Sequence, residues 1–306
     1  MTASLPVVDV APLLSGGEAD RAAVGREIDA ACREVGFFYV VGHGVDDALQ
    51  SRLDELSRAF FALPDEQKAE IAMARGGRAW RGWFAVGEEL TSGVPDLKEG
   101  IYFGAELAAD HPRVAAAMPL HGRNLFPREP AGFGDVVLAY MDAMTGLGQA
   151  ILGGMALGLG RPEGWFRDHL TRDPLVLFRI FHYPPAPDAP REQWGVGEHT
   201  DYGLLTLLRQ DGNGGLSVRS RAGWVDAPPI DGSFVCNLGD MLERLTGDAY
   251  RSTPHRVRNA GASGRLSFPF FLDPSWDGDV GDGTYGAYIL HKVAKVFPDL
   301  ATEADL

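Results

Sequence analysis

The feature that most constrains the fold is a change of pattern at Asp173-Pro174. Before it, apolar residues recur at helical spacing over residues 19–35, 46–61 and 130–159. After it, short runs of β-branched and aromatic residues alternate with glycine-containing turns, at residues 175–183, 204–209, 216–219, 233–238 and 266–272. Short strands at such spacing are typical of a β-sandwich or barrel. The sequence therefore predicts a largely helical first half, a β-rich second half and a final helix over residues 286–297.

The domain organisation follows from the length and the apolar content. With 306 residues, of which 45% are hydrophobic, the chain can bury a sizeable core. It contains no internal repeat, low-complexity tract or obvious linker. We expect one domain, with a helical N-terminal part over about residues 1–170, a β-rich core over about 171–285 and a C-terminal helix over 286–306.

The charge balance excludes two classes of partner. The chain has 28 basic and 42 acidic residues, a net charge of −14, so nucleic acid and anionic membranes, which demand basic surface, are not expected. The N-terminus has no secretory pattern, and the two cysteines, Cys32 and Cys236, are expected to be small buried thiols. The apolar run at 143–160 is better explained as a buried helix than as a membrane span. We expect a cytoplasmic protein that is a monomer or a weak homo-oligomer.

A metal site is indicated by His199 and Asp201, which lie two residues apart between glycines. In an extended chain, residues i and i+2 point to the same face, so an imidazole and a carboxylate converge there. A third ligand has to come from another strand, and His255 is the best candidate. Two histidines and one carboxylate with open positions are the ligand set of non-haem Fe(II) oxygenases.

The competing explanation is that His-x-Asp triplets arise often by chance. Context favours the metal, because the triplet opens a predicted strand and a histidine follows some fifty residues later. A closed zinc site would need four protein ligands, usually including cysteine, and no His-Glu-x-x-His helix is present.

An anion site is indicated by Arg265 and Ser267, which lie two apart on an apolar strand and share a face. The chain from His255 through the turn at 259–264 reads as a hairpin that would bring this strand beside His255. Arginine is costly to bury alone, so Arg265 should meet a carboxylate of the protein or of a ligand. The alternative is that Arg265 lies on the surface.

The segment 74–104 lacks clear periodicity and is rich in aromatic and basic residues. It is either a surface loop or a lid over a pocket. We expect a substrate mouth lined by Arg78, Trp80, Arg81, Trp83, Phe84 and Lys98 of this segment, together with Phe270 and Tyr285. That mixture suits an aromatic or amphipathic small molecule, including one with a carboxylate.

Several motifs along nearly the whole chain carry a family resemblance. They comprise Leu5–Asp9, Gly36–Val45, Phe60–Pro64, Tyr183-Pro184, His199–Asp201, Asn237–Asp240, Thr253–Val257 and Arg265–Ser267. Taken together they resemble the isopenicillin N synthase-like family of Fe(II) oxygenases, most of which depend on 2-oxoglutarate. The resemblance implies a double-stranded β-helix (jelly-roll) core flanked by N-terminal and C-terminal helices. It implies a turn and scaffold role for Asn237 and Asp240.

The same resemblance implies roles for individual residues. The metal ligands would be His199, Asp201 and His255, whereas Arg265 and Ser267 would bind the distal carboxylate of 2-oxoglutarate, with a further hydrogen bond from Tyr183. O2 would be the co-reactant, 2-oxoglutarate would be decarboxylated to succinate, and a small organic molecule would be oxidised, usually by hydroxylation. Many members place asparagine two residues before the equivalent of Tyr183, where this chain has Phe181, so an amide contact to the cosubstrate is lost.

Two alternatives remain at this point. Some relatives keep the Arg-x-Ser pair and use no 2-oxoglutarate, so an oxidase or cyclase of the same fold is the enzymatic alternative. A non-catalytic ligand-binding module is the other, although such a module has no need of an open metal site.

Overall fold

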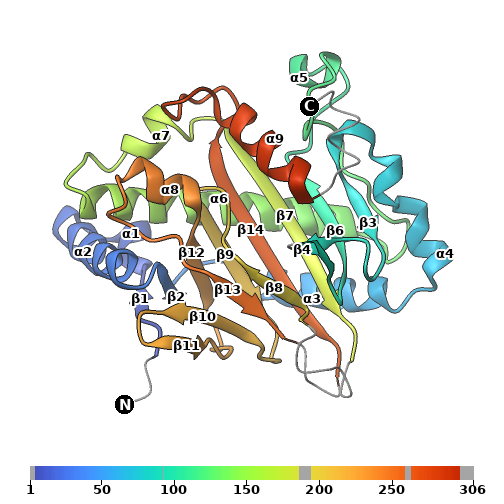
Figure 1. Cartoon of the computed structure of the whole chain (residues 1–306), viewed down its shortest axis with the longest axis horizontal. Coiled ribbons are helices and arrows are strands. Elements are labelled where there is room, and N and C mark those ends of the chain that lie inside the picture. Colours follow the sequence, from blue (N-terminus) through green and yellow to red (C-terminus); the bar gives the residue numbers. More distant parts are fainter. Residues whose placement is uncertain (1–3, 92, 186–193, 259–262, 297–306) are drawn as a thin grey trace.

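Two β-sheets facing one another form the centre of the molecule (Figure 1). The computed structural model describes residues 4–91, 93–185, 194–258 and 263–296. The larger sheet has the order β1 (Val7–Asp9), β2 (Phe37–Val41), β12 (Phe234–Leu238), β9 (Leu205–Gln210), β14 (Arg265–Ser275), β7 (Pro174–Tyr183), β6 (Glu99–Gly104) and β3 (Gly82–Phe84). The smaller sheet has the order β11 (Gly223–Asp226), β10 (Leu216–Ser220), β13 (His255–Val257) and β8 (Val196–His199). A separate hairpin pairs β4 (Leu90–Thr91) with β5 (Val94–Pro95).

The described residues also form helices, so the architecture is mixed α/β. The described α-helices are α1 (Ala11–Ser15), α2 (Glu18–Glu34), α3 (Asp47–Phe61), α4 (Asp65–Lys68), α5 (Pro112–Ala115), α6 (Phe133–Gly158), α7 (Trp165–His169), α8 (Asp240–Leu245) and α9 (Tyr285–Val296). Short 3-10 turns occupy Ala69–Ile71, Met73–Arg75 and Gly77–Ala79. In Figure 1, α6 runs behind the larger sheet, and it contacts β9, β14, α2 and α3.

Helix α6 is apolar because it is the centre of the core. Among the described helices it alone is long and apolar enough to span a membrane by length and composition, and half of its most apolar window is buried inside the molecule. Glycines let α2 approach it closely, since a Cβ on Gly25 would lie 2.9 Å from the carbonyl oxygen of Gly154. The run at residues 143–160 is therefore a core helix in this fold.

Alternation along the central strand separates the core from the cavity between the sheets. On β14, Leu266, Phe268, Phe270 and Leu272 are 0–1% exposed and belong to the apolar core that contains α6. Ser267, Pro269, Phe271 and Asp273 point to the opposite face and line a cavity. Because successive strand residues point to opposite faces, a single strand serves both purposes.

The structure confirms the predicted helices and most predicted strands to within a few residues, but two local predictions are wrong. Of the predicted C-terminal helix, residues 297–306 lie outside the described residues. The segment 74–104 is not irregular throughout, because β3 and β6 extend the larger sheet beyond β7. The predicted hairpin does not form either: β13 pairs with β8 and β10, whereas β14 pairs with β7 and β9 in the other sheet. Of its predicted turn, residues 259–262 lie outside the described residues.

Candidate active site and metal centre

Two imidazoles meet across the smaller sheet. His199 ends β8 and His255 begins β13, and the two residues are direct partners in the antiparallel register. Side chains opposite one another on paired strands lie about 4.5–5.5 Å apart at Cβ, so the register alone brings the rings together. Their centroids are 4.2 Å apart.

A carboxylate completes this group. Asp201 lies just beyond the end of β8, and its Oδ1 is 3.9 Å from His199 Nε2 and 3.8 Å from His255 Nε2. All three potential ligand atoms lie within 4.8 Å of one another. The structure therefore gathers the three side chains that the sequence predicted, although His199 closes a strand where the prediction had the triplet opening one.

Backbone carbonyls set the tautomers of both histidines. His199 Nδ1 lies 2.8 Å from the Gly197 oxygen, and His255 Nδ1 lies 3.2 Å from the Thr253 oxygen. A carbonyl can only accept, so Nδ1 carries the proton and the Nε2 lone pair is left for a metal. Burial lowers the pKa of His255 to about 4, and the nearby His199 acts in the same direction. Both effects favour the neutral imidazole that ligates metals.

Two neighbours orient the carboxylate. Asp201 Oδ2 accepts hydrogen bonds from Thr206 Oγ1 at 2.5 Å and Asn237 Nδ2 at 2.7 Å, which leaves Oδ1 facing the imidazoles. Burial would raise the pKa of Asp201, but the two histidines and these hydrogen bonds outweigh it and hold the pKa below its usual value. Asn237 thus contacts a potential metal ligand directly, which its turn-like sequence context did not predict.

We expect Asn237→Ala to weaken metal binding about 10- to 100-fold, the usual effect of removing a group that orients a ligand. The Asp201 carboxylate would lose one of its two side-chain donors and become free to rotate. Isothermal titration with Mn(II) measures the change, and Ser233→Ala, just before the same strand, is the matched control. An Mn(II) affinity equal to that of the control would contradict the assigned orienting role.

The three side chains open into a cavity of about 210 Å³ between the sheets. One end is walled by Tyr183, Ser267 and apolar residues of both sheets. Arg265 lies in register with Tyr183 on the neighbouring strand, and its guanidinium carbon is 4.8 Å from the Tyr183 ring centroid. Tyr183 and Ser267 are hydrogen-bonded through their side chains.

Arg265 is the strongest indication of an acid-binding site. The residue is 0% exposed, yet none of its three guanidinium nitrogens has a hydrogen-bond partner among the described residues. A buried, unpaired charge is costly, and arginine pairs best with a carboxylate in a two-pronged geometry. Arg265 is not itself among the residues that line the cavity, but Tyr183 and Ser267 beside it are, so an acid that reached between them would satisfy it. The residues present thus fit both a metal with two imidazoles and one carboxylate, and a carboxylic acid beside it.

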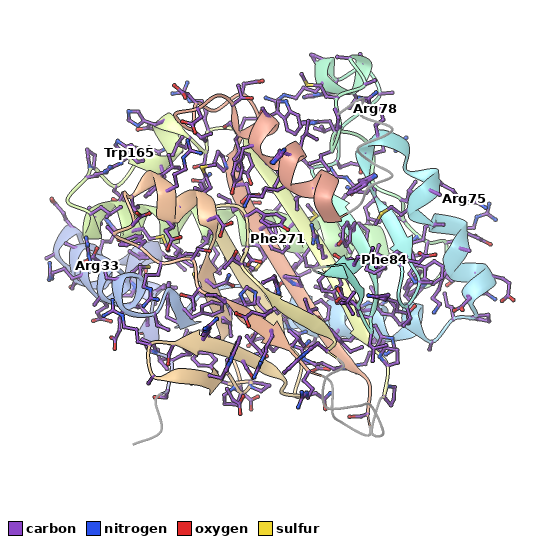
Figure 2. The ribbon with its side chains drawn as sticks, in the orientation of Figure 1. Arg33, Arg75, Arg78, Phe84, Trp165 and Phe271 are labelled. Carbon is purple, nitrogen blue, oxygen red and sulfur yellow. The ribbon has the colours of Figure 1, made fainter. Side chains whose placement is uncertain are left out.

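The other end of the cavity contains only part of the predicted substrate mouth. Trp80, Arg81 and Lys98 line it, whereas Arg78, Trp83, Phe84, Phe270 and Tyr285 are not among the lining residues. Figure 2 shows Arg78 at the periphery near α5, well away from Phe271 at the centre.

Four of these five side chains are buried and have contacts elsewhere. Trp83 Nε1 donates to Glu99 Oε2 at 2.9 Å, Phe84 packs edge-on against Tyr102, and Phe270 faces the core. Tyr285 contacts a residue of the cavity wall from behind, because its hydroxyl donates to Asp273 Oδ2 at 2.7 Å.

Sequence reasoning missed several polar and aromatic residues in this wall. They are Glu89, Tyr102, Arg179, Tyr202, Phe271 and Asp273. For Phe271 and Asp273 the signal was present, because they share the period-two face of Arg265 and Ser267. Glu89 comes from the turn before β4, and nothing local marked it.

The pKa of Asp273 predicts a pH-dependent stability term. Burial raises it to about 6, although hydrogen bonds from Tyr285 and the Leu204 amide oppose the rise. The native state then binds more protons than the unfolded state between pH 4 and 6, so this contribution is complete below about pH 4 and lost as pH rises through about 6. The free energy of unfolding of Asp273→Asn should therefore rise by roughly 3 kcal/mol relative to that of the unaltered protein as the pH is raised from 4 to 7.

Urea unfolding of both proteins at a series of pH values measures this difference, and Asp226→Asn, which removes an exposed carboxylate at the end of β11, is the control variant. A difference between Asp273→Asn and the unaltered protein that does not vary with pH would contradict the prediction.

The fold and the site define a class: an oxygenase that uses non-haem iron and 2-oxoglutarate. Two family models match the chain, one described as "non-haem dioxygenase in morphine synthesis N-terminal" over residues 5–129 and one as "2OG-Fe(II) oxygenase superfamily" over residues 174–274. The chain belongs to this family of non-haem Fe(II)/2-oxoglutarate dioxygenases. It is an oxidoreductase that acts on a small molecule with Fe(II), 2-oxoglutarate and O2.

Individual relatives support this over most of the chain. A probable iron/ascorbate oxidoreductase of Dictyostelium discoideum is 43% identical, covering 97% of this chain and 95% of that protein. A homoarginine-6-hydroxylase of Oryza sativa subsp. japonica is 38% identical over 90% and 88%. The crystal structure of a full-length Neurospora crassa protein in complex with alpha-KG and thymine superposes with a TM-score of 0.81 and 27% identity, over 96% and 97%. The chain shares the jelly-roll fold of these oxygenases.

Proposed function

We propose that His199, Asp201 and His255 bind Fe(II) through Nε2, Oδ1 and Nε2. Arg265, Ser267 and Tyr183 bind the distal carboxylate of 2-oxoglutarate, and α6 and α9 flank the jelly-roll core of a single domain. The observation that carries this proposal is the fully buried Arg265, whose guanidinium has no partner among the described residues and lies beside Tyr183. When bound, iron, 2-oxoglutarate and O2 supply an oxidant while the acid is converted to succinate and CO2.

The protein's own residues do the positioning. Arg265 and Ser267 orient the cosubstrate, and Thr206 and Asn237 keep Asp201 Oδ1 turned toward the metal. The position that carries asparagine in many relatives is Phe181, whose ring stands edge-on to Tyr183. An apolar ring there excludes water from the proposed cosubstrate site, which strengthens the Arg265–carboxylate attraction.

The reaction we propose is hydroxylation of a small organic molecule that carries a carboxylate. Guanidinium and ammonium groups line the substrate end at Arg81, Arg179 and Lys98, among aromatic rings. Homoarginine, named for the Oryza sativa relative, is also a small carboxylate-bearing molecule. The location in the cytoplasm and the weak or absent self-association stay predictions of the sequence.

Reconstitution under anaerobic conditions with Fe(II) and 2-oxoglutarate tests the proposal. Admitting air with a panel of candidate small molecules should give succinate in proportion to oxidised product. Arg219→Met, an exposed arginine of the smaller sheet, should behave like the unaltered protein. Oxidised product without stoichiometric succinate would instead support a 2-oxoglutarate-independent oxidase.

A further inference from the structure

The substrate end of the cavity contains a guanidinium that aromatic rings hold in place and that donates no hydrogen bond to another described residue. Arg179 on β7 is in register with Tyr102 on β6, and its guanidinium carbon lies 4.1 Å from the Tyr102 ring centroid and 5.0 Å from that of Phe271. The side chain is 23% exposed and makes no hydrogen bond to another described residue. Stacking between rings fixes the plane of an arginine and leaves its donors at the edge available for a ligand.

A carboxylate stands beside this guanidinium without pairing fully with it. Glu89 Oε1 is 4.0 Å from Arg179 NH1, which is longer than the charge-assisted hydrogen bond of about 2.7–2.9 Å. The Glu89 side chain is buried and held in place, because Tyr102 donates to Oε1 at 2.5 Å and Lys98 Nζ lies 3.0 Å from Oε2. Two opposite charges of the cavity wall are thus fixed side by side, both facing the interior.

The charges of this end are already balanced. Lys98 is also paired with Asp96, and Arg81 and Asp273 line the same wall, so three carboxylates, one ammonium and two guanidinium groups sum to zero at neutral pH. A ligand with only a carboxylate or only an ammonium group would leave an uncompensated charge in a largely buried site, which is costly. A head group that carries both charges keeps the balance and can use both wall groups.

We propose that Arg179 and Glu89 bind the zwitterionic head group of an α-amino acid, with the carboxylate on Arg179 and the ammonium on Glu89. This deepens and rests on the proposed function, whose iron and 2-oxoglutarate would oxidise the side chain of that amino acid. Arg179 and Tyr183 share one face of β7 four residues apart, about 13 Å at the rise of a strand. The head group therefore binds well away from the cosubstrate, and the substrate side chain can extend toward the metal ligands.

Ligand comparison on the unaltered protein tests the proposal without any substitution. With Mn(II) and 2-oxoglutarate bound, titration calorimetry compares L-leucine, L-lysine and L-arginine with their decarboxylated amines and with their deaminated acids. For at least one of the three, the amino acid should bind at least about 30-fold more tightly than both its amine and its acid, the ratio that about 2 kcal/mol represents. Equal binding within every set, or no amino acid binding at millimolar concentration, would overturn the proposal.

Substitutions then show which residue binds the carboxylate and which binds the ammonium group. Arg179→Met should abolish the preference for the amino acid over its amine, and Arg179→Lys, which keeps the charge but not the planar fork, should restore only part of it. Glu89→Gln should abolish the preference over the deaminated acid alone. Arg123→Met, an exposed arginine, should change neither preference. Preferences that survive both Arg179→Met and Glu89→Gln would show that other groups bind the head group.

The same titrations separate this inference from the proposed function. Failure of Mn(II) and 2-oxoglutarate to bind the unaltered protein would refute the proposed function. Normal binding of both, without discrimination among the ligand sets, would refute only the head-group assignment.

Discussion

Asp201→Ala is expected to lower Fe(II) affinity by more than about 100-fold and to abolish substrate oxidation. Altering a group that merely orients a ligand typically costs 10- to 100-fold, and this change removes the ligand itself. It also leaves the hydroxyl of Thr206 and the amide of Asn237 without their acceptor. The two imidazoles alone, 4.2 Å apart at their centroids, would provide only two of the three protein ligands.

Fe(II) titration under anaerobic conditions and succinate formation in air are the two measurements. Asp226→Ala removes an exposed carboxylate from the same smaller sheet and should leave both at the level of the unaltered protein. Unchanged Fe(II) affinity in Asp201→Ala would place the metal elsewhere in the molecule and end the assignment of this site.

Arg265→Met is expected to change two quantities: it should weaken the binding of 2-oxoglutarate and stabilise the ligand-free protein. The dissociation constant of 2-oxoglutarate should rise about 30- to several thousand-fold, because losing one partner of a buried charge pair costs about 2–5 kcal/mol. The free energy of unfolding without ligand should rise by about 1–3 kcal/mol, since a buried guanidinium with no partner among the described residues is replaced by an apolar side chain. A purely structural arginine would show the reverse effect on stability.

The first quantity is measured by titrating 2-oxoglutarate into the Mn(II)-loaded protein, and the second by urea unfolding of the metal-free protein. Mn(II) affinity itself should not change, which distinguishes loss of the acid site from collapse of the metal centre. Arg219→Met provides the matched exposed control. A 2-oxoglutarate affinity equal to that of the control would mean that the acid binds at another cation.

How much of the site was predictable depends on whether its residues share one strand. Arg265, Ser267 and Phe271 lie on one period-two face, so the choice of Phe270 for the substrate mouth contradicted a rule already applied to its neighbours. Strand pairing was harder to predict, because a connection of only a few residues between 255–257 and 265–275 is equally compatible with a hairpin and with a crossing between sheets. The hairpin prediction failed there.

The prediction for residues 82–104 was wrong for a related reason. Strands β3 and β6 are only three and six residues long, and they are stabilised by pairing with one another and with β7. Local pattern cannot reveal a strand whose partner lies about eighty residues away, since β-propensity depends strongly on context.

The sequence by itself indicated the order of helices and strands and two pairs of proposed site residues, His199 with Asp201 and Arg265 with Ser267, because these follow from local spacings of two or of three to four residues. Only the tertiary structure decided which charges share the cavity. Glu89, Lys98 and Arg179 come from different segments, and their mutual distances depend on how the edge of the larger sheet pairs. Such distances arise from long-range packing, which no short stretch of sequence encodes.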